Sequence, residues 1–583
     1  MTGALRVLVL GLVLAVLAVP AAVSAQSDPP GKGKENAQTT EIQILGLNDF
    51  HGNLEPPTGS GGRIGALTNN QCIEPTCYLA GGVEYLATHV RDLEQTNPNT
   101  VFVSAGDLIG ATPLLSALFH DEPTIEAFNL MGLDFNGVGN HEFDEGVDEL
   151  LRMQNGGCHP VDGCQDGDGF EGADFQFLAA NVKYKSNSET IFPPYAIRHF
   201  QGIKVAFVGM TLEGTPSIVS PAGISHVDFF DEADSVNALV PVLKRQNVET
   251  IIVLLHEGGS TTNSNGVGTV AAINECNALS GALPPIVDRM DDEIDVVVTG
   301  HTNWAVNCVV DGKIVTGAAH QGRLVTDIDL TISRATKDVV SATVNNHIVT
   351  RGVAKAPDLT SLVADYQAIA APIANRVIGQ ISADILRAAN AAGESALGDV
   401  IADAQLAATE AADRGDAVVA FMNPGGIRTD LLYASSAAGE GDGNVTYGEM
   451  FAVQPFGNSM VTMTLTGAQI ERLLEEQFAG CTLATARVLQ VSVGFTYTWK
   501  ASGPVCDKVD PSTIEIGGVP VVAGNSYRVT VNSFLADGGD SFPILTQGTD
   551  RLGGEVDTDA LERYIATNSP VPPGPQDRIT VVP

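Results

Sequence analysis

The sequence has few positive charges and little charge of any kind. Of its 583 residues, 31 are Lys or Arg and 69 are Asp or Glu, which gives a net charge of −38, and charged residues make up only 17%. Nucleic-acid polymers and anionic membranes are bound through Lys and Arg, so this composition argues against both as partners. Hydrophobic residues reach 44%, which excludes a disordered chain, and the length allows several domains.

Long hydrophobic runs are also scarce, and the one clear example lies at the N-terminus. Arg6 is followed by an apolar run over Val7–Val19, then Pro20 and the small-residue tripeptide Val23-Ser24-Ala25. This pattern predicts a signal peptide over residues 1–25, because a membrane helix would need about 20 apolar residues. Residues 26–40 are polar and predict a flexible leader. We therefore expect a secreted or extracytoplasmic protein with no membrane anchor.

The sequence contains no Cys-x-x-Cys pair, which argues against a zinc site built from cysteines. Eight cysteines in an exported chain instead suggest disulfides, although eight allow 105 pairings in principle. Proximity along the chain suggests Cys72–Cys77, Cys158–Cys164, Cys276–Cys308 and Cys481–Cys506.

Polar residues able to bind metal follow several short apolar runs in the first half of the chain. The runs at 42–47, 101–104, 135–138, 251–255 and 294–298 read as strands, with helical stretches such as 83–93 and 123–131 between them. Alternating strands and helices predict a largely parallel α/β arrangement, in which ligands gather beyond the carboxyl ends of the strands. The residues placed at these ends are Asp49, His51, Asp107, Asn140, His256, His301 and Asn303.

This set of side chains indicates a two-metal site. Asp49 and His51 are two residues apart, so in extended chain they point the same way, and Asp107 can bridge two cations with its two oxygens. Mixed nitrogen and oxygen donors favour zinc, manganese or a similar divalent metal over calcium or magnesium. Two ions about 3.5–4 Å apart would hold a hydroxide for attack on a phosphoryl group. A lone His after a strand is usually only a polar loop residue, but all five signals together favour metal-assisted phosphoester hydrolysis.

A second pair, His141 and Asp144, lies in the segment Gly139-Asn140-His141-Glu142-Phe143-Asp144. Asp144 could orient the imidazole of His141 and favour its protonated form, so that His141 stabilises phosphoryl oxygens or protonates the leaving group. The structural alternative is that Asp144 caps a helix. The remaining histidines that we considered lack this context, and His120, near an apolar helix, is expected to be polar surface.

The segments NDFHGN, GDLIGATP, GNHEFDEG, LLHEGG and GHTNW resemble the calcineurin-like metallophosphoesterases. In the second half, ESALGDVIADA, NPGGIR, YGEMFAVQPFGNSM and NSFLADGGDSFPIL resemble the C-terminal domain of exported 5′-nucleotidases and UDP-sugar hydrolases. The resemblance implies a four-layer α/β/β/α metallophosphoesterase domain (41–350), a linking helix (351–378) and a mixed α/β substrate-binding domain (379–583). It also implies that the second domain can rotate relative to the first.

The resemblance further implies substrate-binding roles in the second half. Asn423, Gly426 and Arg428 would face the nucleotide, Phe456 and Phe534 would sandwich its base, and Asp540 would accept from the ribose hydroxyls. The residues themselves agree in part, because Gly425 and Gly426 let backbone amides approach an anion and Arg428 can grip it bidentately. One departure concerns a second phosphate-binding arginine, since Gly393 stands where relatives often carry Arg and Arg387 is the nearest.

The leading hypothesis is a secreted two-metal hydrolase that releases phosphate from nucleoside 5′-phosphates, a small-molecule substrate. A 2′,3′-cyclic nucleotide phosphodiesterase with 3′-nucleotidase activity and a UDP-sugar hydrolase are the alternatives among enzymes. A catalytically silent nucleotide-binding surface protein is the alternative from another class. The sequence leaves the metal, the preferred base and the oligomeric state open.

Overall fold

The computed structural model describes residues 38–583, apart from residues 70, 218, 220, 263–267, 437 and 484. The predicted signal peptide and almost all of the predicted leader lie outside the described residues.

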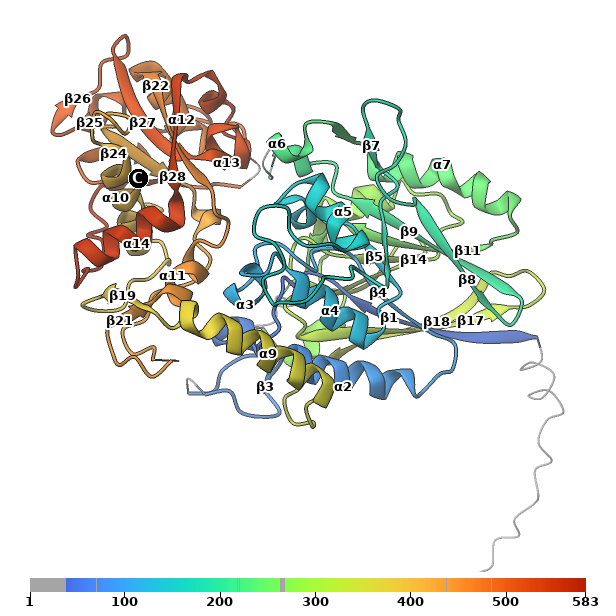
Figure 1. The fold of residues 1–583 in the computed structure, drawn as a ribbon. Helices are drawn as coiled ribbons and strands as arrows, with labels where there is room; N and C mark the ends of the chain where they lie inside the picture. The colour runs from blue at the N-terminus through green and yellow to red at the C-terminus, as the bar shows by residue number, and fades with distance from the viewer. Residues whose placement is uncertain are drawn as a thin grey trace, which may run out of the picture.

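Two six-stranded sheets form the first half of the chain (Figure 1). The first has the order β18-β17-β1-β4-β5-β6, and its strands are β1 (Thr39–Leu47), β4 (Thr100–Ser104), β5 (Phe135–Gly137), β6 (Gln176–Leu178), β17 (Leu324–Ser333) and β18 (Val339–Ile348). The second has the order β15-β16-β14-β11-β9-β8, with β8 (Tyr195–Phe200), β9 (Ile203–Thr211), β11 (Thr250–His256), β14 (Val296–Thr299), β15 (Ala305–Val310) and β16 (Lys313–Ala318). The central strands of both sheets are parallel, so their carboxyl ends share an edge.

The two sheets pack face to face, with helices on both outer faces. Between them, Ile44 and Val103 of the first sheet share one apolar cluster with Phe207, Leu254 and Val298 of the second. A second cluster joins the outer face of the first sheet to α2 (Val83–Glu94), α4 (Glu122–Met131), α5 (Val147–Asn155) and α9 (Pro357–Ala374). A third joins the other sheet to α7 (Glu232–Arg245) and α8 (Leu283–Val287). The predicted four-layer α/β/β/α arrangement is confirmed.

The second half is mixed α/β, as predicted. A five-stranded sheet has the order β23-β20-β27-β22-β28, from β20 (Val419–Met422), β22 (Ser459–Thr466), β23 (Gln490–Val491), β27 (Ser526–Asn532) and β28 (Thr549–Val556). A four-stranded sheet contains β24 (Phe495–Lys500), β25 (Glu515–Ile516), β26 (Val519–Pro520) and β29 (Ile579–Val582). The helices are α10 (Ala396–Thr409), α11 (Tyr447–Val453), α12 (Gly467–Glu476), α13 (Ser533–Ala536) and α14 (Asp557–Thr567).

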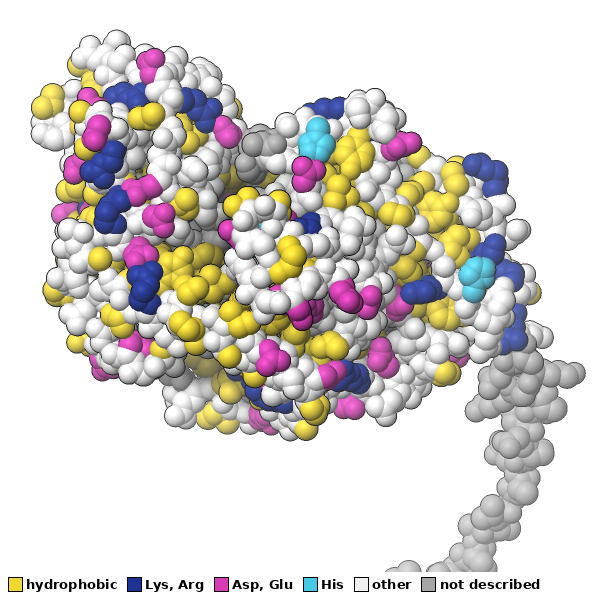
Figure 2. Space-filling view, viewed as in Figure 1, with side chains coloured by type: hydrophobic (Ala, Val, Ile, Leu, Met, Phe, Trp, Pro, Cys, Tyr) yellow, Lys and Arg dark blue, Asp and Glu magenta, His cyan; other side chains and the backbone are white. Residues whose placement is uncertain are grey.

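Helix α9 leads from the first half to the second. It packs on α2, α3 (Leu114–Ala117) and α4 of the first half and on α11 of the second. The space-filling view shows the surface hollowed between the two halves (Figure 2). Shorter pairs of strands flank the main sheets: β2 (Arg63–Gly65) with β3 (Cys77–Leu79), β7 (Val182–Tyr184) with β10 (Val227–Phe229), β12 (Gly259–Ser260) with β13 (Ser280–Gly281) and β19 (Val377–Gln380) with β21 (Asn444–Thr446).

All four predicted cysteine pairs are disulfides in the structure: Cys72–Cys77, Cys158–Cys164, Cys276–Cys308 and Cys481–Cys506. None of the helices in the described part of the chain combines the length and the apolar character needed to cross a membrane.

Candidate active site

Six of the seven predicted metal ligands form a closed ring of contacts at the shared edge of the two sheets. His51 Nε2 lies 3.9 Å from Asp49 Oδ1 and 3.7 Å from Asp107 Oδ2. Asp107 Oδ2 lies 3.0 Å from His256 Nε2, which is 3.1 Å from Asn140 Oδ1. Asn140 Oδ1 is in turn 2.9 Å from His301 Nδ1, and the backbone N–H of His301 donates to Asp49. These side chains therefore surround one small volume.

The seventh predicted ligand, Asn303, is not part of this ring in the structure. Its side-chain amide lies 3.4 Å from the carbonyl oxygen of His301, two residues earlier. Asn303 therefore stays a prediction as a ligand.

The backbone is strained where several of the predicted ligands lie. Asp49, His51, Asp107, His301 and Asn303 all have φ between 49° and 70°. Residues with a β-carbon adopt this left-handed region at a cost and do so most often at functional sites. The sharp turns that follow the strands thus aim these side chains back over the sheet edge.

Glycine is required beside these turns because backbone and side chains approach closely. A β-carbon on Gly106 would lie 2.7 Å from His256 Nδ1, and one on Gly139 would lie 2.3 Å from Asp107 Oδ1. In the Gly-Asp and Gly-Asn dipeptides of the sequence, glycine is therefore needed because the site has no room for a β-carbon, as well as for the turn.

Two of the histidines are held in a fixed orientation by the main chain. The Nδ1 atom of His51 lies 2.8 Å from the carbonyl oxygen of Gly110, and that of His256 lies 2.7 Å from the carbonyl oxygen of Ala105. When Nδ1 donates to these carbonyls, Nε2 is left to face Asp107, as in metal-binding histidines generally.

Burial and mutual charge shift the ionisation of these groups strongly. Burial lowers the pKa of His51 to about 3 and that of His301 to about 4, so both rings are neutral at pH 7. Burial raises the pKa of Asp49 to about 7. Although burial alone would lower it, the carboxylate of Asp107 raises the pKa of His256 to about 10. His51 and His301 are neutral, so protonated His256 is the cation that keeps Asp107 ionised here, and a bound divalent metal would take over that role.

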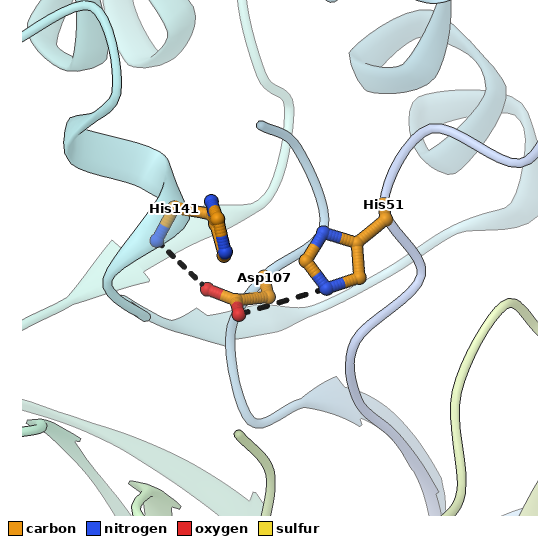
Figure 3. Close-up of side chains that lie close together, drawn as sticks. All are labelled: His51, Asp107 and His141. Carbon is orange, nitrogen blue, oxygen red and sulfur yellow. Dashed lines mark hydrogen bonds and ion pairs between the residues drawn. The ribbon is translucent and has the colours of Figure 1, made fainter. Parts of the chain in front are cut away.

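His141 and Asp144 lie next to this ring of ligands. Nδ1 of His141 is 2.8 Å from Asp144 Oδ2, and the backbone N–H of His141 donates to Asp107 Oδ1 at 2.9 Å. Figure 3 shows Asp107 between His51 and His141, with its contacts to the His51 ring and to the His141 backbone N–H drawn. Although burial opposes it, the negative charges of Asp144 and Asp107 raise the pKa of His141 to about 9. The ring is therefore protonated at pH 7.

Glu142, which no pattern of the sequence marked as functional, holds the loops that carry Asp107 and Asn140. Its buried carboxylate accepts from the backbone N–H groups of Asp107 (3.0 Å), Leu108 (3.0 Å) and Gly139 (2.7 Å). His320 is also missed, although it follows β16 as the other histidines follow their strands. Burial lowers its pKa well below the usual value, with the charges of Arg323 and His51 adding to the effect.

Two of the predicted substrate-binding residues of the second half, Phe456 and Arg428, lie close to His141. The ring of Phe456 is stacked on that of His141 with centroids 6.1 Å apart, and the Arg428 guanidinium lies 5.6 Å from the Phe456 centroid. The positive charge of Arg428 also acts to lower the pKa of His141. The second half therefore presents an arginine and an aromatic ring to the site of the first.

The other predicted substrate-binding residues form a separate group. Asn423 Nδ2 donates to Asp540 Oδ2 at 2.8 Å, and Asn532 Nδ2 donates to Asn423 Oδ1 at 3.0 Å. Asp540 also pairs with Arg487, a residue that the sequence analysis does not single out. Phe534 packs against Gly539 and the core of the second half. Among the described residues, no ring contact joins Phe456 directly to Phe534.

Comparison with known proteins agrees with this architecture. Residues 42–304 match the family model for calcineurin-like phosphoesterases, and residues 377–547 match that for the C-terminal domain of 5′-nucleotidases. Endonuclease YhcR of Bacillus subtilis is 31% identical over 552 residues, which cover 93% of this chain but 41% of YhcR. Cell wall protein Lmo0130 of Listeria monocytogenes is 31% identical over 563 residues, 91% of this chain and 67% of its own length. The chain belongs to the 5′-nucleotidase family of calcineurin-like phosphoesterases.

A solved 5′-nucleotidase precursor from Thermus thermophilus has the same fold as this chain. Its TM-score is 0.70 at 24% identity, and the match covers 93% of this chain and 99% of that chain. The chain described here is thus a hydrolase of the 5′-nucleotidase type and a metal-dependent phosphoesterase. It spans less than half the length of YhcR, which is therefore a much larger protein.

Proposed function

We propose that the protein is exported and removes phosphate from nucleoside 5′-monophosphates. The observation that carries this proposal is the stacking of Phe456 on His141 beneath the Arg428 guanidinium. An arginine suits a phosphate and an aromatic ring suits a base, and both face the catalytic pair from the half that matches the nucleotidase C-terminal domain.

Seven residues would hold the two divalent ions: Asp49, His51, Asp107, Asn140, His256, His301 and Asn303. The donor set fits, because buried carboxylates and neutral imidazoles already converge on one volume. When bound, such ions act as Lewis acids toward the phosphoryl oxygens and make water a competent nucleophile at neutral pH.

The protein's own residues would orient the substrate and supply a proton. His141 donates from Nε2, since Nδ1 is engaged by Asp144, and it stabilises a phosphoryl oxygen or protonates the leaving group. Arg428 would hold the phosphate with a second charged contact, which limits the orientations that the substrate can take.

A cavity beside Arg428 favours a second candidate substrate class, the nucleoside diphosphate sugars. It has a volume of about 630 Å³ and is lined by residues that include Arg387, Asn390, Arg487 and Trp499. Arg387, whose charge acts on Arg428, and Arg487 could hold a second phosphate, and Asn390 could bind a sugar hydroxyl. Arg487 already neutralises Asp540, which lowers the capacity of that carboxylate to accept from a ribose.

Hydrolysis of a panel of AMP, UDP-glucose, 2′,3′-cyclic AMP and p-nitrophenyl phosphate, followed by chromatography of all products with and without chelator, tests the proposal. We expect the highest kcat/KM on AMP and loss of all activity with chelator. Higher kcat/KM on UDP-glucose would favour the second candidate, and binding of AMP without turnover would contradict both. N-terminal sequencing of protein recovered outside the cells tests export, with Gln26 as the expected first residue.

A further inference from the structure

Two histidines that lack the strand-end pattern, His120 and His159, meet outside the catalytic site. Their rings are stacked with centroids 3.7 Å apart and planes 17° from parallel. Glu145 Oε2 lies 3.0 Å from Nδ1 of His120, and Asp162 Oδ2 lies 2.9 Å from its Nε2. Asp162 Oδ2 is also 3.2 Å from Nδ1 of His159. His120 is therefore more than the polar surface residue expected from the sequence.

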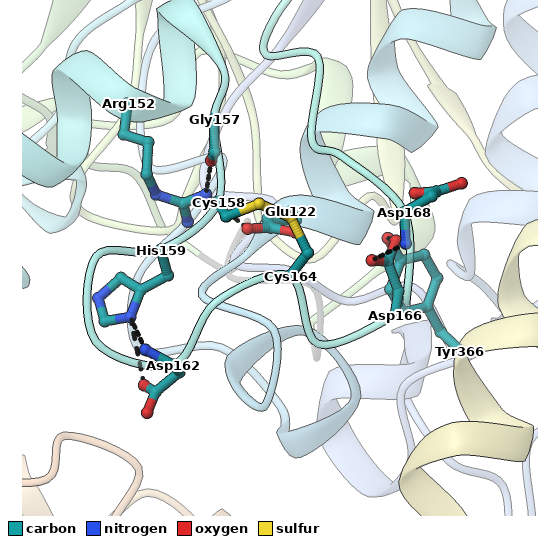
Figure 4. Close-up of a disulfide and its surroundings, with 10 residues drawn as sticks. All are labelled: Glu122, Arg152, Gly157, Cys158, His159, Asp162, Cys164, Asp166, Asp168 and Tyr366. Atoms are coloured by element: carbon teal, nitrogen blue, oxygen red, sulfur yellow. Dashed lines mark hydrogen bonds and ion pairs between the residues drawn. A yellow bond between two sulfur atoms is a disulfide. The ribbon is translucent and has the colours of Figure 1, made fainter.

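These four residues, which we call the histidine–carboxylate cluster, are held by constrained segments. His159 and Asp162 lie among the five residues between Cys158 and Cys164, which a disulfide joins, as Figure 4 shows. The backbone N–H of Gly163 donates to the carbonyl of His159 at 2.9 Å, and this hydrogen bond further restricts the conformation of the loop. His120 lies between α3 and α4, and its side chain is only 18% exposed.

We propose that the histidine–carboxylate cluster binds a transition-metal dication such as Zn²⁺, separate from the catalytic pair of ions. One ligand atom each from His120, Glu145 and His159 lies within 4.8 Å of the others, and Asp162 contacts both rings. Glu145 faces Nδ1 of His120 and Asp162 faces its Nε2, so Asp162 orients the two rings from outside the site. The two imidazoles and the Glu145 carboxylate are three protein ligands of the kind that zinc accepts, with a water as the fourth.

The cluster is joined to the catalytic site through the residues next to its ligands. Glu145 follows Asp144, whose carboxylate holds His141 and accepts from the backbone N–H of Ala111 at 3.1 Å. His120 precedes Asp121, whose carboxylate accepts from the N–H of Gly110, while the carbonyl of Gly110 contacts His51. An ion in the cluster would thus fix both loops that position His141 and His51.

The competing arrangement has no ion and holds one proton. Although burial opposes it, the carboxylates of Glu145 and Asp162 raise the pKa of His120 to about 9, so an imidazolium could bridge them. His159 has no role in that bridge, because both nitrogens of His120 are already paired. Removal of the His159 imidazole therefore separates the two arrangements.

Zinc binding to the full mature chain tests the proposal. The double variant Asp107→Asn, His256→Ala weakens the catalytic centre, and equilibrium dialysis against Zn²⁺ then counts the ions bound elsewhere. We expect one tight zinc in this background and at least about a 10-fold weaker site when His159→Ala is added. His199→Ala is the matched control, because His199 is an exposed histidine of β8 outside the cluster, and it should keep the zinc.

A second variant guards against loss of the fold. Asp162→Asn keeps the size of the side chain but removes its charge, and circular dichroism with thermal unfolding confirms that it is folded. Co²⁺ in place of Zn²⁺ gives a d–d absorption spectrum that reports tetrahedral ligation without any activity measurement. The absence of a tight zinc in the double variant would overturn the proposal. Equal zinc affinity with and without His159 and Asp162 would overturn it as well.

Discussion

The two halves of the molecule hold their functional residues in different ways. In the first half, the carboxylates of Asp49 and Asp107 are completely buried, and main-chain carbonyls fix the rings of His51 and His256. In the second half, Arg428 is exposed, Phe456 and Phe534 are half-buried, and the Arg487 side chain is 41% exposed. A rigid polar centre suits chemistry that needs fixed ligand geometry, while exposed arginines and rings can adapt to a substrate.

The contact of Phe456 with His141 joins these two halves. It depends on how the second half sits against the first, since Phe456 follows α11, on which α9 packs. We therefore expect substitutions in the first half to change turnover or metal binding, and substitutions in the second half to change substrate preference, except at this contact. The substitutions below are ordered from the largest expected effect to the smallest.

Replacement of Asp107 should have the largest effect, because this carboxylate lies between His51 and His256 and faces both rings. We expect Asp107→Asn to lower kcat by more than about 10³-fold, beyond the usual loss from one missing electrostatic contact. Phosphate release from AMP in metal-replete buffer measures the loss, and metal analysis should show fewer ions per chain. Unchanged turnover would contradict the two-metal assignment.

Replacement of His141 should spare the metals. His141→Asn removes the proton donor but leaves the ring of ligands intact, so we expect kcat to fall by about 10²–10⁴-fold with metal content unchanged. Metal analysis and AMP hydrolysis on the same preparation give both values. A parallel fall in bound metal would instead make His141 a ligand.

The two phenylalanines should differ, because only Phe456 touches the catalytic pair. Loss of base stacking costs about 1–3 kcal/mol, or roughly 5- to 150-fold in kcat/KM. We expect Phe534→Ala to lose activity on AMP but to hydrolyse p-nitrophenyl phosphate almost as before. Phe456→Ala should lower kcat/KM on both substrates, with the larger loss on AMP.

The measurements are kcat/KM of both variants on AMP and on p-nitrophenyl phosphate, together with the melting temperature of each variant. Equal losses for Phe534→Ala on both substrates, with a lower melting temperature, would show that this ring is only a core residue. Full activity on AMP would show that the base is bound elsewhere.

Replacement of Glu142 should weaken metal binding, although its carboxylate bonds to the backbone and not to the predicted ligand side chains. Glu142→Gln weakens three hydrogen bonds from the Asp107 and Gly139 loops. We expect metal affinity to fall by about 10- to 100-fold, as for other residues that orient ligands. Activity titrated against added metal should recover at high metal concentration, which a lost catalytic group would not do.

The smallest effect concerns the thiols. Each cysteine in the structure belongs to a disulfide, so titration of denatured, unreduced protein should give no free thiol. Reduction should affect the catalytic centre only through Cys276–Cys308, because this loop contains His301 and Asn303 while Cys72–Cys77 and Cys158–Cys164 enclose no predicted ligand. Two or more free thiols per chain would contradict this pairing.

Local patterns were sufficient for much of the fold. Apolar runs ending at Asn48, Gly106 and Gly300 predict β1, β4 and β14, because a buried parallel strand needs a continuous apolar stretch and a turn after it. Near neighbours in the sequence also predicted the short disulfide loops. Boundaries were less certain, since His256 is the last residue of β11 and not the residue after it.

The sequence by itself determined which residues are able to bind metal and at which sheet edge they lie, because parallel strands bring their carboxyl ends together whatever the loops do. Only the tertiary structure decided which distant groups meet: Glu142 with the Asp107 loop, Arg487 with Asp540, Phe456 with His141, and His120 with His159. These contacts join residues from 35 to 315 positions apart, and their partners depend on how whole layers and halves pack. No local pattern of side chains encodes that packing, so no motif could reveal them.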